Sequence, residues 1–236
     1  MLLSHGELET LFHEFGHALH SLLSRTEFQH LSGTRGAADF VEVPSILFER
    51  FAWDERVLRL FARHHATGAP LPARVGASLR AARAACAATE TLTQIVHARL
   101  DQELFGAGAA SAGGGRGDDT TEALARIQRE VMPWVPHAPG THWHARFGHL
   151  TGYGASYYGY LWDRVIAAQL WRALFAADPL DRGAGTRLWR ELLAHGSAAD
   201  PHAALAALVD DCGGDPLCPS AFLAEIGEDG DDDWRD

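Results

Sequence analysis

Residues 11–24 of the chain read LFHEFGHALHSLLS, in which His13 and His17 stand four positions apart and Glu14 follows the first of them. On a helix, residues four positions apart lie on the same face, so both imidazoles can bind one metal ion. Two neutral imidazoles suit Zn²⁺, and a catalytic zinc site needs one more protein ligand and an open position for water. Glu14 would point at that open position, where a carboxylate acts as a general base toward water.

The third ligand is predicted to be Glu42, within the stretch DFVEVPS at residues 39–45. The interval after His17 holds the end of the first helix, a polar turn that contains glycines, and the start of an antiparallel helix. Because proline is tolerated best in a first helical turn, Pro44 places the start of this second helix shortly before Glu42. His13, His17 and Glu42 would then form a site for one Zn²⁺ ion.

The ring nitrogen of His13 that faces away from the metal needs a hydrogen-bond partner, because such partners fix the orientation of a ligating imidazole. Glu9 stands one helical turn before His13, and Glu49 lies in the second predicted helix, so both are candidates. Either carboxylate, taken alone, is better explained as a surface group, and the sequence leaves the partner open.

The chain is predicted to be all-α, because no segment shows a convincing two-residue alternation of apolar and polar side chains. Residues 8–23 place apolar side chains on more than one face, as a helix buried on several sides does. Residues 73–105 are rich in alanine and free of proline, and predict one long helix or two in succession. Residues 107–119 predict a flexible glycine-rich loop, followed by a helix over residues 122–132.

The 236 residues are assigned to a catalytic domain over residues 1–222 and an acidic tail over residues 223–236 that is expected to be disordered. The formal net charge of −11 argues against a nucleic-acid partner. No apolar run reaches the length of a membrane helix, so no membrane association is expected. No signal peptide is expected either, because Ser4 and Glu7 already have the spacing of a helix capping box.

Three stretches of the chain resemble the thimet oligopeptidase family of zinc metallopeptidases, peptidase family M3. They are HEFGH at 13–17, FVEVPS at 40–45 and RFGHLTGYGASYYGYLW at 146–162. Within this family the sequence resembles the mitochondrial intermediate peptidase most, in the stretches RTEFQH at 25–30 and TGAPLP at 67–72. Members of the family are several times longer and carry the zinc motif in their C-terminal part, so the chain resembles their C-terminal catalytic portion.

The resemblance implies a helical zincin-type domain that forms part of a two-lobed metallopeptidase with a deep channel, which admits short or unstructured peptides. It also implies roles for the third stretch, because peptide hydrolysis builds negative charge on a carbonyl oxygen that needs hydrogen-bond donors. Tyr157 and Tyr160, three positions apart and predicted to share a helix face, are assigned to this oxyanion. His149 and Tyr153 are assigned to substrate contact, as is Gly33 in the turn after the first helix.

Two competing interpretations of this region stay open. An aromatic stripe that packs a helical core would explain Tyr158 and Trp162 equally well. His142, His144 and His149 form a rival candidate for a metal site, which is weaker because they lack the four-residue spacing of helical ligands.

The predicted function is that of a zinc metalloendopeptidase acting on short or unfolded peptides. By resemblance, its substrates are imported precursor intermediates in the mitochondrial matrix, from which it removes short N-terminal peptides. One alternative is a general oligopeptidase of the cytosol or an organelle, and another is a truncated zinc-binding module without activity. The expected partner is a peptide or unfolded precursor, and the expected cofactor is one Zn²⁺ ion.

Overall fold

The computed structural model describes residues 2–107, 119–209, 215 and 217–227. Its chain forms two compact units, Met1–Ala85 with Trp162–Asp236, and Cys86–Leu161. Within the described residues every regular element is helical, and the only β-type pairing is an isolated bridge between Arg63 and Pro70. The all-α prediction is therefore confirmed for the part of the chain that the structure describes.

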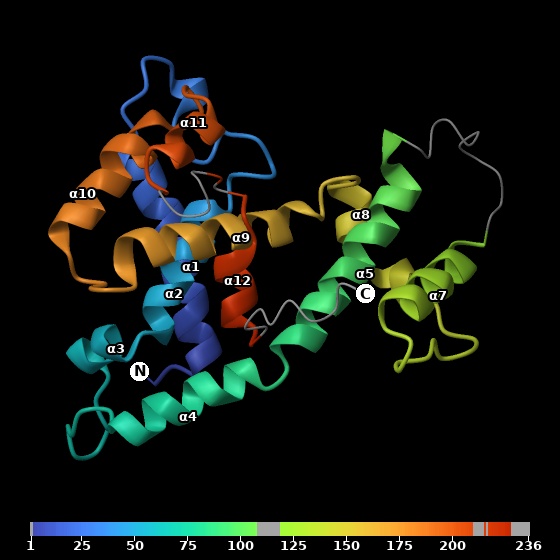
Figure 1. Cartoon of the computed structure of the whole chain (residues 1–236), viewed down its shortest axis with the longest axis horizontal. Coiled ribbons are helices and arrows are strands. Elements are labelled where there is room, and N and C mark those ends of the chain that lie inside the picture. The colour runs from blue at the N-terminus through green and yellow to red at the C-terminus, as the bar shows by residue number, and fades with distance from the viewer. Residues whose placement is uncertain (1, 108–118, 210–214, 216, 228–236) are drawn as a thin grey trace. The chain divides into compact units, whose positions relative to one another are not determined.

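The larger unit is made of helices (Figure 1), and several of them share one apolar core. Val43 and Leu47 pack there against Ile166, Leu170 and Leu188, all at most 3% exposed. The α- and π-helices of this unit are α1 (His5–Leu23), α2 (Val43–Trp53), α3 (Glu55–Phe61), α4 (Ala73–Ala84), α9 (Gly159–Leu170), the π-helical turn Trp171–Phe175, α10 (Arg182–Glu191), α11 (Pro201–Ala206) and α12 (Ser220–Glu225). Helix α9 belongs to this unit only from Trp162 onward.

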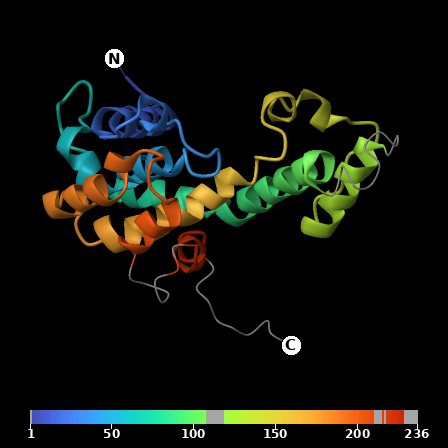
Figure 2. The same ribbon diagram turned by 90° about the horizontal axis from the view of Figure 1, so that it is seen from above.

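Helix α1 begins with the capping box that the sequence predicts. The Glu7 N–H donates to Ser4 Oγ at 3.3 Å, and the Ser4 N–H donates in return to the Glu7 carboxylate at 2.7 Å. These two bonds satisfy backbone donors that have no partner inside a helix, and so fix where α1 starts. The helix then runs side by side with α2 (Figures 1 and 2).

The close approach of α1 and α2 depends on Gly16, which is buried in α1. A Cβ atom at this position would lie 2.5 Å from the Ser45 Cα and 2.7 Å from the Pro44 carbonyl oxygen. Both are backbone atoms of α2, so they cannot rotate away as a side chain would. Gly16 therefore brings α2 close to the face of α1 that carries the two histidines.

Replacing Gly16 with alanine is expected to destabilise the fold by about 1–3 kcal/mol or more, because the two helices must move apart. Urea or thermal unfolding measures this loss. Gly6→Ala is the matched control on the same helix, since a Cβ there meets nothing within 4 Å. If both variants unfold at the same denaturant concentration, Gly16 does not set the helix spacing.

Helix α2 starts slightly later than predicted. Glu42 is the residue before its first turn, Val43 begins the helix, and Pro44 lies in the first turn, where its missing N–H costs nothing. The prediction that the helix begins before Glu42 is therefore wrong by about one position. Asp54 ends α2 and caps α3 by accepting a hydrogen bond from the Arg56 N–H at 2.8 Å.

The smaller unit contains α5 (Ala87–Phe105), α7 (Thr120–Val131) and α8 (His149–Gly152), with a 3₁₀ turn at Trp143–Arg146. Leu100 of α5 and Ile127 of α7 are fully buried and belong to one apolar cluster between these two helices. The α7 cap is Asp119, which accepts a hydrogen bond from the Thr121 N–H at 2.9 Å. Residues 73–105 thus form two helices, α4 and α5, and the predicted glycine-rich loop lies outside the described residues except at its ends.

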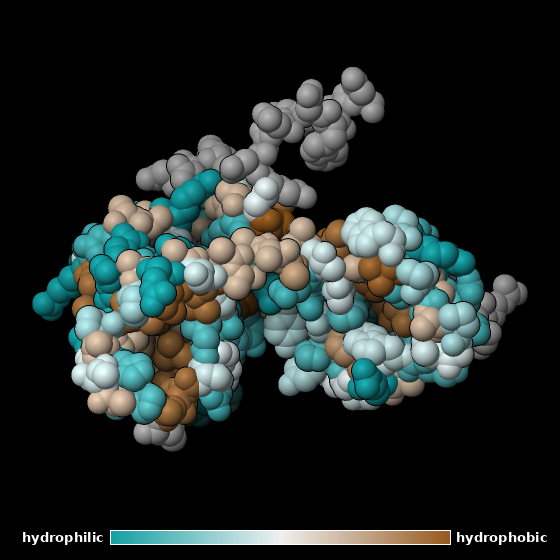
Figure 3. Space-filling model, turned by 90° about the horizontal axis from the view of Figure 1, so that it is seen from below, coloured by the Kyte–Doolittle hydropathy of each residue, from teal (hydrophilic) through white to brown (hydrophobic). Residues whose placement is uncertain are grey.

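The predicted boundary at residue 222 falls inside α12, which continues to Glu225 and is tied to α2 by an ion pair between Arg50 and Glu225. Residues 228–236 of the predicted acidic tail lie outside the described residues. Among the helices described, none combines the length and the apolar character that a membrane span requires. Figure 3 shows brown apolar areas on the surface of the larger unit, and the large apolar side chains exposed on α1 are Leu11, Phe15 and Leu22.

Candidate metal centre

The three predicted ligands come together in the larger unit. His13 Nε2 lies 3.3 Å from Glu42 Oε2, and His17 Nε2 lies 3.1 Å from the same oxygen. The two histidines project from successive turns of α1, and Glu42 comes from the residue that precedes α2. Each side chain is about a quarter exposed, so the cluster is open to solvent on one side.

These residues fit a zinc ion. Ligand atoms at 2.0–2.1 Å from one tetrahedral zinc are about 3.3 Å apart, close to the separations between Glu42 Oε2 and the two ring nitrogens. The donor set of two imidazoles and one carboxylate is that of catalytic zinc sites, which keep a fourth position for water. Among the described residues this is the one group of three such side chains close enough together to hold a metal ion.

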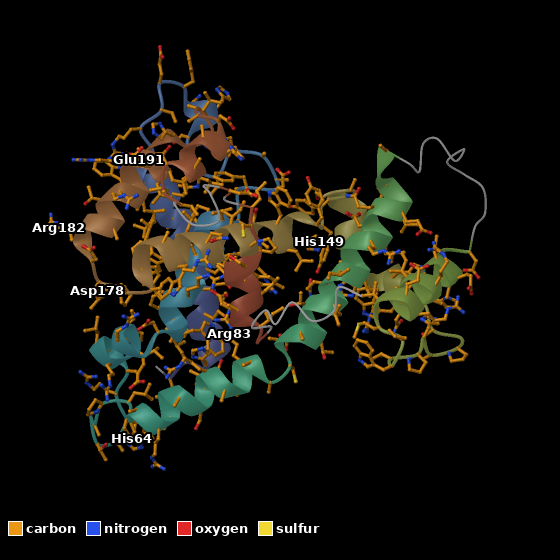
Figure 4. All side chains as sticks on the ribbon, in the orientation of Figure 1. His64, Arg83, His149, Asp178, Arg182 and Glu191 are labelled. Carbon is orange, nitrogen blue, oxygen red and sulfur yellow. The ribbon has the colours of Figure 1, made fainter. Side chains whose placement is uncertain are left out.

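The partner of His13 is Glu49, not Glu9. His13 Nδ1 lies 2.7 Å from Glu49 Oε1, a geometry in which Nδ1–H donates to the carboxylate and Nε2 is directed toward the metal. Glu9 instead accepts a hydrogen bond from the Trp53 indole at 2.6 Å, and the Arg83 guanidinium (Figure 4) lies 4.5 Å from the centre of that indole ring.

The electrostatics of the cluster follow from these contacts. Hydrogen bonds to Glu42 and Glu49 raise the pKa of His13 to about 10, and hydrogen bonds from the two histidines hold the pKa of Glu42 well below its usual range. Zinc binds imidazole only in its deprotonated form, so binding is expected to release the proton that His13 holds at neutral pH. The affinity for zinc should therefore fall as the pH falls.

Removing the Glu49 carboxylate is expected to weaken zinc binding by about 10- to 100-fold, since it leaves His13 without the group that orients it. Competition with a chromophoric chelator measures the dissociation constant of the Glu49→Ala protein. The matched control is Glu9→Ala, which removes a carboxylate that contacts Trp53 and should leave the zinc affinity unchanged. Equal affinities for the two variants would contradict the role of Glu49.

The backbone of Glu42 is held by a residue that sequence reasoning missed. The Glu42 N–H donates to Asp163 Oδ2 at 3.1 Å, and Asp163 of α9 is fully buried. Burial and the neighbouring charges of Glu42 and Asp39 raise the pKa of Asp163 to about 8, although that hydrogen bond opposes the shift. The Glu42 side chain also accepts from Ser45 Oγ at 2.8 Å. Nothing in the sequence pattern marks Asp163, since 121 positions separate it from Glu42.

Glu14 lies beside the candidate ligands and is not part of the three-residue group that could hold a metal ion. It lines a cavity of about 520 Å³ together with the candidate ligands His17 and Glu42. Ala18 and Ser21 of α1 also line the cavity, as do Thr34 and Val41. Its volume is in the range of small-molecule and peptide side-chain sites. A carboxylate at this place can exchange a proton with a water or a substrate next to the metal.

Gly33 does not line this cavity. It has a left-handed φ of +62°, is buried, and donates its N–H to Ser24 Oγ at 3.1 Å. A Cβ on it would lie 2.8 Å from the Ser21 Cα, so glycine allows the turn to pack against α1. The residue of this turn that borders the cavity is Thr34, and substrate contact by Gly33 stays a prediction.

The aromatic residues of the third stretch come together in the smaller unit. His149 (Figure 4) begins α8, and its Nε2 lies 2.9 Å from the Tyr160 hydroxyl. Its ring lies 5.1 Å from that of Tyr157 and 5.5 Å from that of Tyr153. The Tyr157 hydroxyl donates to Gln94 Oε1 at 2.6 Å. The four predicted residues thus form one cluster, whose roles toward substrate stay predictions.

One detail of this cluster differs from the prediction. Tyr157 does not share a helix with Tyr160, because α9 starts only at Gly159. Tyr157 lies in the turn before it, two positions after Ala155, whose φ is +64°. The two tyrosine rings nevertheless lie 5.3 Å apart.

The rival histidine site is not formed within the part of the chain that the structure describes. His142 lies 2.8 Å from the Thr121 hydroxyl, and His144 lies 2.8 Å from the Thr120 hydroxyl. Both histidines therefore contact the first turn of α7, whereas His149 contacts Tyr160.

Known proteins match most of the chain. The model of peptidase family M3 matches residues 1–228 of the chain. The mitochondrial intermediate peptidase of Arabidopsis thaliana is 48% identical over 84% of the chain and 27% of its own length. The mitochondrial intermediate peptidase of Homo sapiens is 42% identical over 95% of the chain and 31% of its own length. That of Neurospora crassa is 46% identical over 89% of the chain and 26% of its own length. The chain thus spans about a quarter to a third of the length of these curated relatives.

Proposed function

Because the chain belongs to peptidase family M3, we propose that it is the zinc-binding catalytic part of a metalloendopeptidase that cleaves short or unfolded peptides. The observation that carries this proposal is the convergence of His13, His17 and Glu42 on one point, with Glu14 lining the adjacent cavity. Two imidazoles, a carboxylate ligand and a nearby carboxylate base are the parts that metal-assisted hydrolysis of an amide requires.

His13, His17 and Glu42 would hold a zinc ion, which would supply a Lewis acid and would lower the pKa of a bound water to about 7. Glu14 is assigned to take the proton from the attacking water and to deliver it to the leaving amine. Glu49 keeps His13 in the tautomer that a metal requires, and Asp163 holds the backbone of Glu42. Tyr157 and Tyr160, by resemblance, donate hydrogen bonds to the oxyanion.

The surface beside the cavity supports a peptide as substrate. On α1, Leu11, Phe15 and Leu22 are 44–70% exposed. By helical geometry these positions form a stripe that borders the face carrying Glu14, Ala18 and Ser21. Exposed apolar side chains next to a polar reaction site suit an extended peptide, because its apolar side chains can pack on α1 while its backbone reaches the metal.

We further propose that the substrates are precursor intermediates in the mitochondrial matrix, each of which loses a short N-terminal peptide. The names of the relatives support this choice over a general oligopeptidase. The test compares a peptide from the start of such an intermediate with a shuffled peptide of the same composition, and mass spectrometry identifies the cleavage sites. We expect one cleavage near the N-terminus and a kcat/KM at least about tenfold higher than for the shuffled peptide.

Equal rates and scattered cleavage sites on both peptides would favour a general oligopeptidase. No cleavage of either peptide by the zinc-loaded chain would contradict its assignment as a working peptidase.

A further inference from the structure

Asp101 is a buried carboxylate in the smaller unit that lies outside the metal centre. It is on α5 and only 1% exposed. A carboxylate in such a place needs hydrogen-bond donors, because an unsatisfied buried charge is costly. The two donors that it has are both backbone N–H groups of one turn, those of Ala155 and Tyr157.

The geometry is that of a clamp on this turn. Asp101 Oδ1 accepts from the Ala155 N–H at 2.9 Å, and Oδ2 accepts from the Tyr157 N–H at 3.0 Å. The next residue of α5, Gln102, donates from Nε2 to the Ala155 carbonyl oxygen at 2.8 Å. Two successive residues of α5 therefore bind two backbone N–H groups and one backbone carbonyl group of residues 155–157.

The turn needs this support. Ala155 has a φ of +64°, a conformation that a residue with a Cβ adopts only when its surroundings impose it. Gly154, just before it, packs so closely on α5 that a Cβ would lie 3.0 Å from the Phe105 ring. The strained backbone is thus held against α5 by Asp101 and by close packing.

What the turn carries is Tyr157, whose hydroxyl donates to Gln94, a further residue of α5. The Tyr157 ring also lies against Phe147 and His149, with ring centres 4.9 and 5.1 Å apart. A tyrosine that is to donate to a developing oxyanion needs its ring already in position, so that only the hydroxyl hydrogen has to turn from Gln94 Oε1 to the oxyanion.

We propose that Asp101 is a positioning residue that fixes the turn of residues 154–157 and thereby the hydroxyl of Tyr157. This inference rests on the proposed peptidase function for the role of Tyr157, but the clamp itself is a property of the smaller unit. Asp101 acts through the backbone of this turn and, on this proposal, does not touch the substrate.

The first test is amide hydrogen exchange of the full chain. In the Asp101→Asn protein one carboxylate oxygen becomes an amide N–H₂ group that faces a backbone donor, so the exchange rates of the Ala155 and Tyr157 amides should rise by about tenfold or more. Amides of α1 and α2 should not change. The matched control is Glu103→Gln on the same helix, whose carboxylate instead pairs with Arg126. Unchanged exchange at residues 155 and 157 would overturn the proposal.

A second variant covers the case in which Asp101→Asn does not fold. Gln102 is exposed, and its replacement by alanine removes only the bond to the Ala155 carbonyl oxygen. Faster exchange confined to the same turn supports the clamp, and unchanged exchange in a folded Gln102→Ala protein contradicts it.

The second test is a double-mutant cycle with Tyr157→Phe, read as kcat and KM separately. If Asp101 acts through Tyr157, Asp101→Asn lowers kcat with little change in KM, and the double variant loses no more than the worse single variant. Additive losses would overturn the positioning role. A Tyr157→Phe protein with unchanged kcat would refute the oxyanion assignment of the proposed function, whereas the exchange experiment would still decide the clamp.

Discussion

The Glu14→Gln protein is expected to bind zinc as the unmodified chain does and to lose peptide hydrolysis by about 100- to 10,000-fold, the usual contribution of a general base. The physical reason is the position of Glu14, which lines the cavity beside His17 and Glu42 without belonging to the proposed ligand set. Glutamine keeps the size of the side chain but cannot accept a proton at neutral pH. The measurements are zinc content by atomic spectroscopy and hydrolysis of a quenched fluorescent peptide.

The control for this change is Glu9→Gln, another carboxylate of α1 converted to an amide. Its side chain contacts Trp53, so hydrolysis should stay at the level of the unmodified chain. Loss of zinc from the Glu14→Gln protein would show that Glu14 is a ligand, and full hydrolysis by that protein would show that the base is another group.

The His17→Ala protein is expected to bind zinc more than about 100-fold more weakly, a larger loss than the 10- to 100-fold caused by removing a partner of a ligand. His17 Nε2 lies 3.1 Å from Glu42 Oε2 and is one of the three protein atoms proposed to bind the metal. Chelator competition measures the affinity, and far-ultraviolet circular dichroism checks that the helices are retained. The variant His30→Ala, at an exposed residue outside the cluster, serves as the control.

An unchanged zinc affinity in the His17→Ala protein would place the metal elsewhere. A pH series adds a second check, because zinc competes with the proton that Glu42 and Glu49 stabilise on His13. The affinity of the unmodified chain should therefore decrease as the pH is lowered.

Much of the metal centre can be predicted from the sequence because its determinants are local. The four-residue spacing of His13 and His17 places both side chains on one face of a helix, and the Ser4 and Glu7 pair marks where that helix begins. Glu42 is recognisable from its neighbours, since Pro44 marks the first turn of the helix that it precedes. These signals need no knowledge of distant contacts.

The parts that sequence reasoning missed depend on contacts between residues far apart in the chain. Asp163 binds the Glu42 N–H across 121 positions, and Asp101 binds the Tyr157 N–H across 56. An isolated aspartate in a helical pattern gives no sign of such a partner. The same cause explains why Tyr157 was wrongly predicted to share a helix with Tyr160. The left-handed backbone of Ala155 is held by a hydrogen bond to α5, and the residue type gives no sign of a turn there.

Binding of one zinc ion by two imidazoles and one carboxylate can be observed in the zinc K-edge X-ray absorption spectrum of the purified, zinc-loaded chain. The structure predicts a shell of nitrogen and oxygen atoms at about 2.0–2.1 Å with the scattering of two imidazole rings, and loss of one ring in the His17→Ala protein. A sulfur ligand at about 2.3 Å, a third imidazole, or a spectrum that His17→Ala leaves unchanged would contradict it.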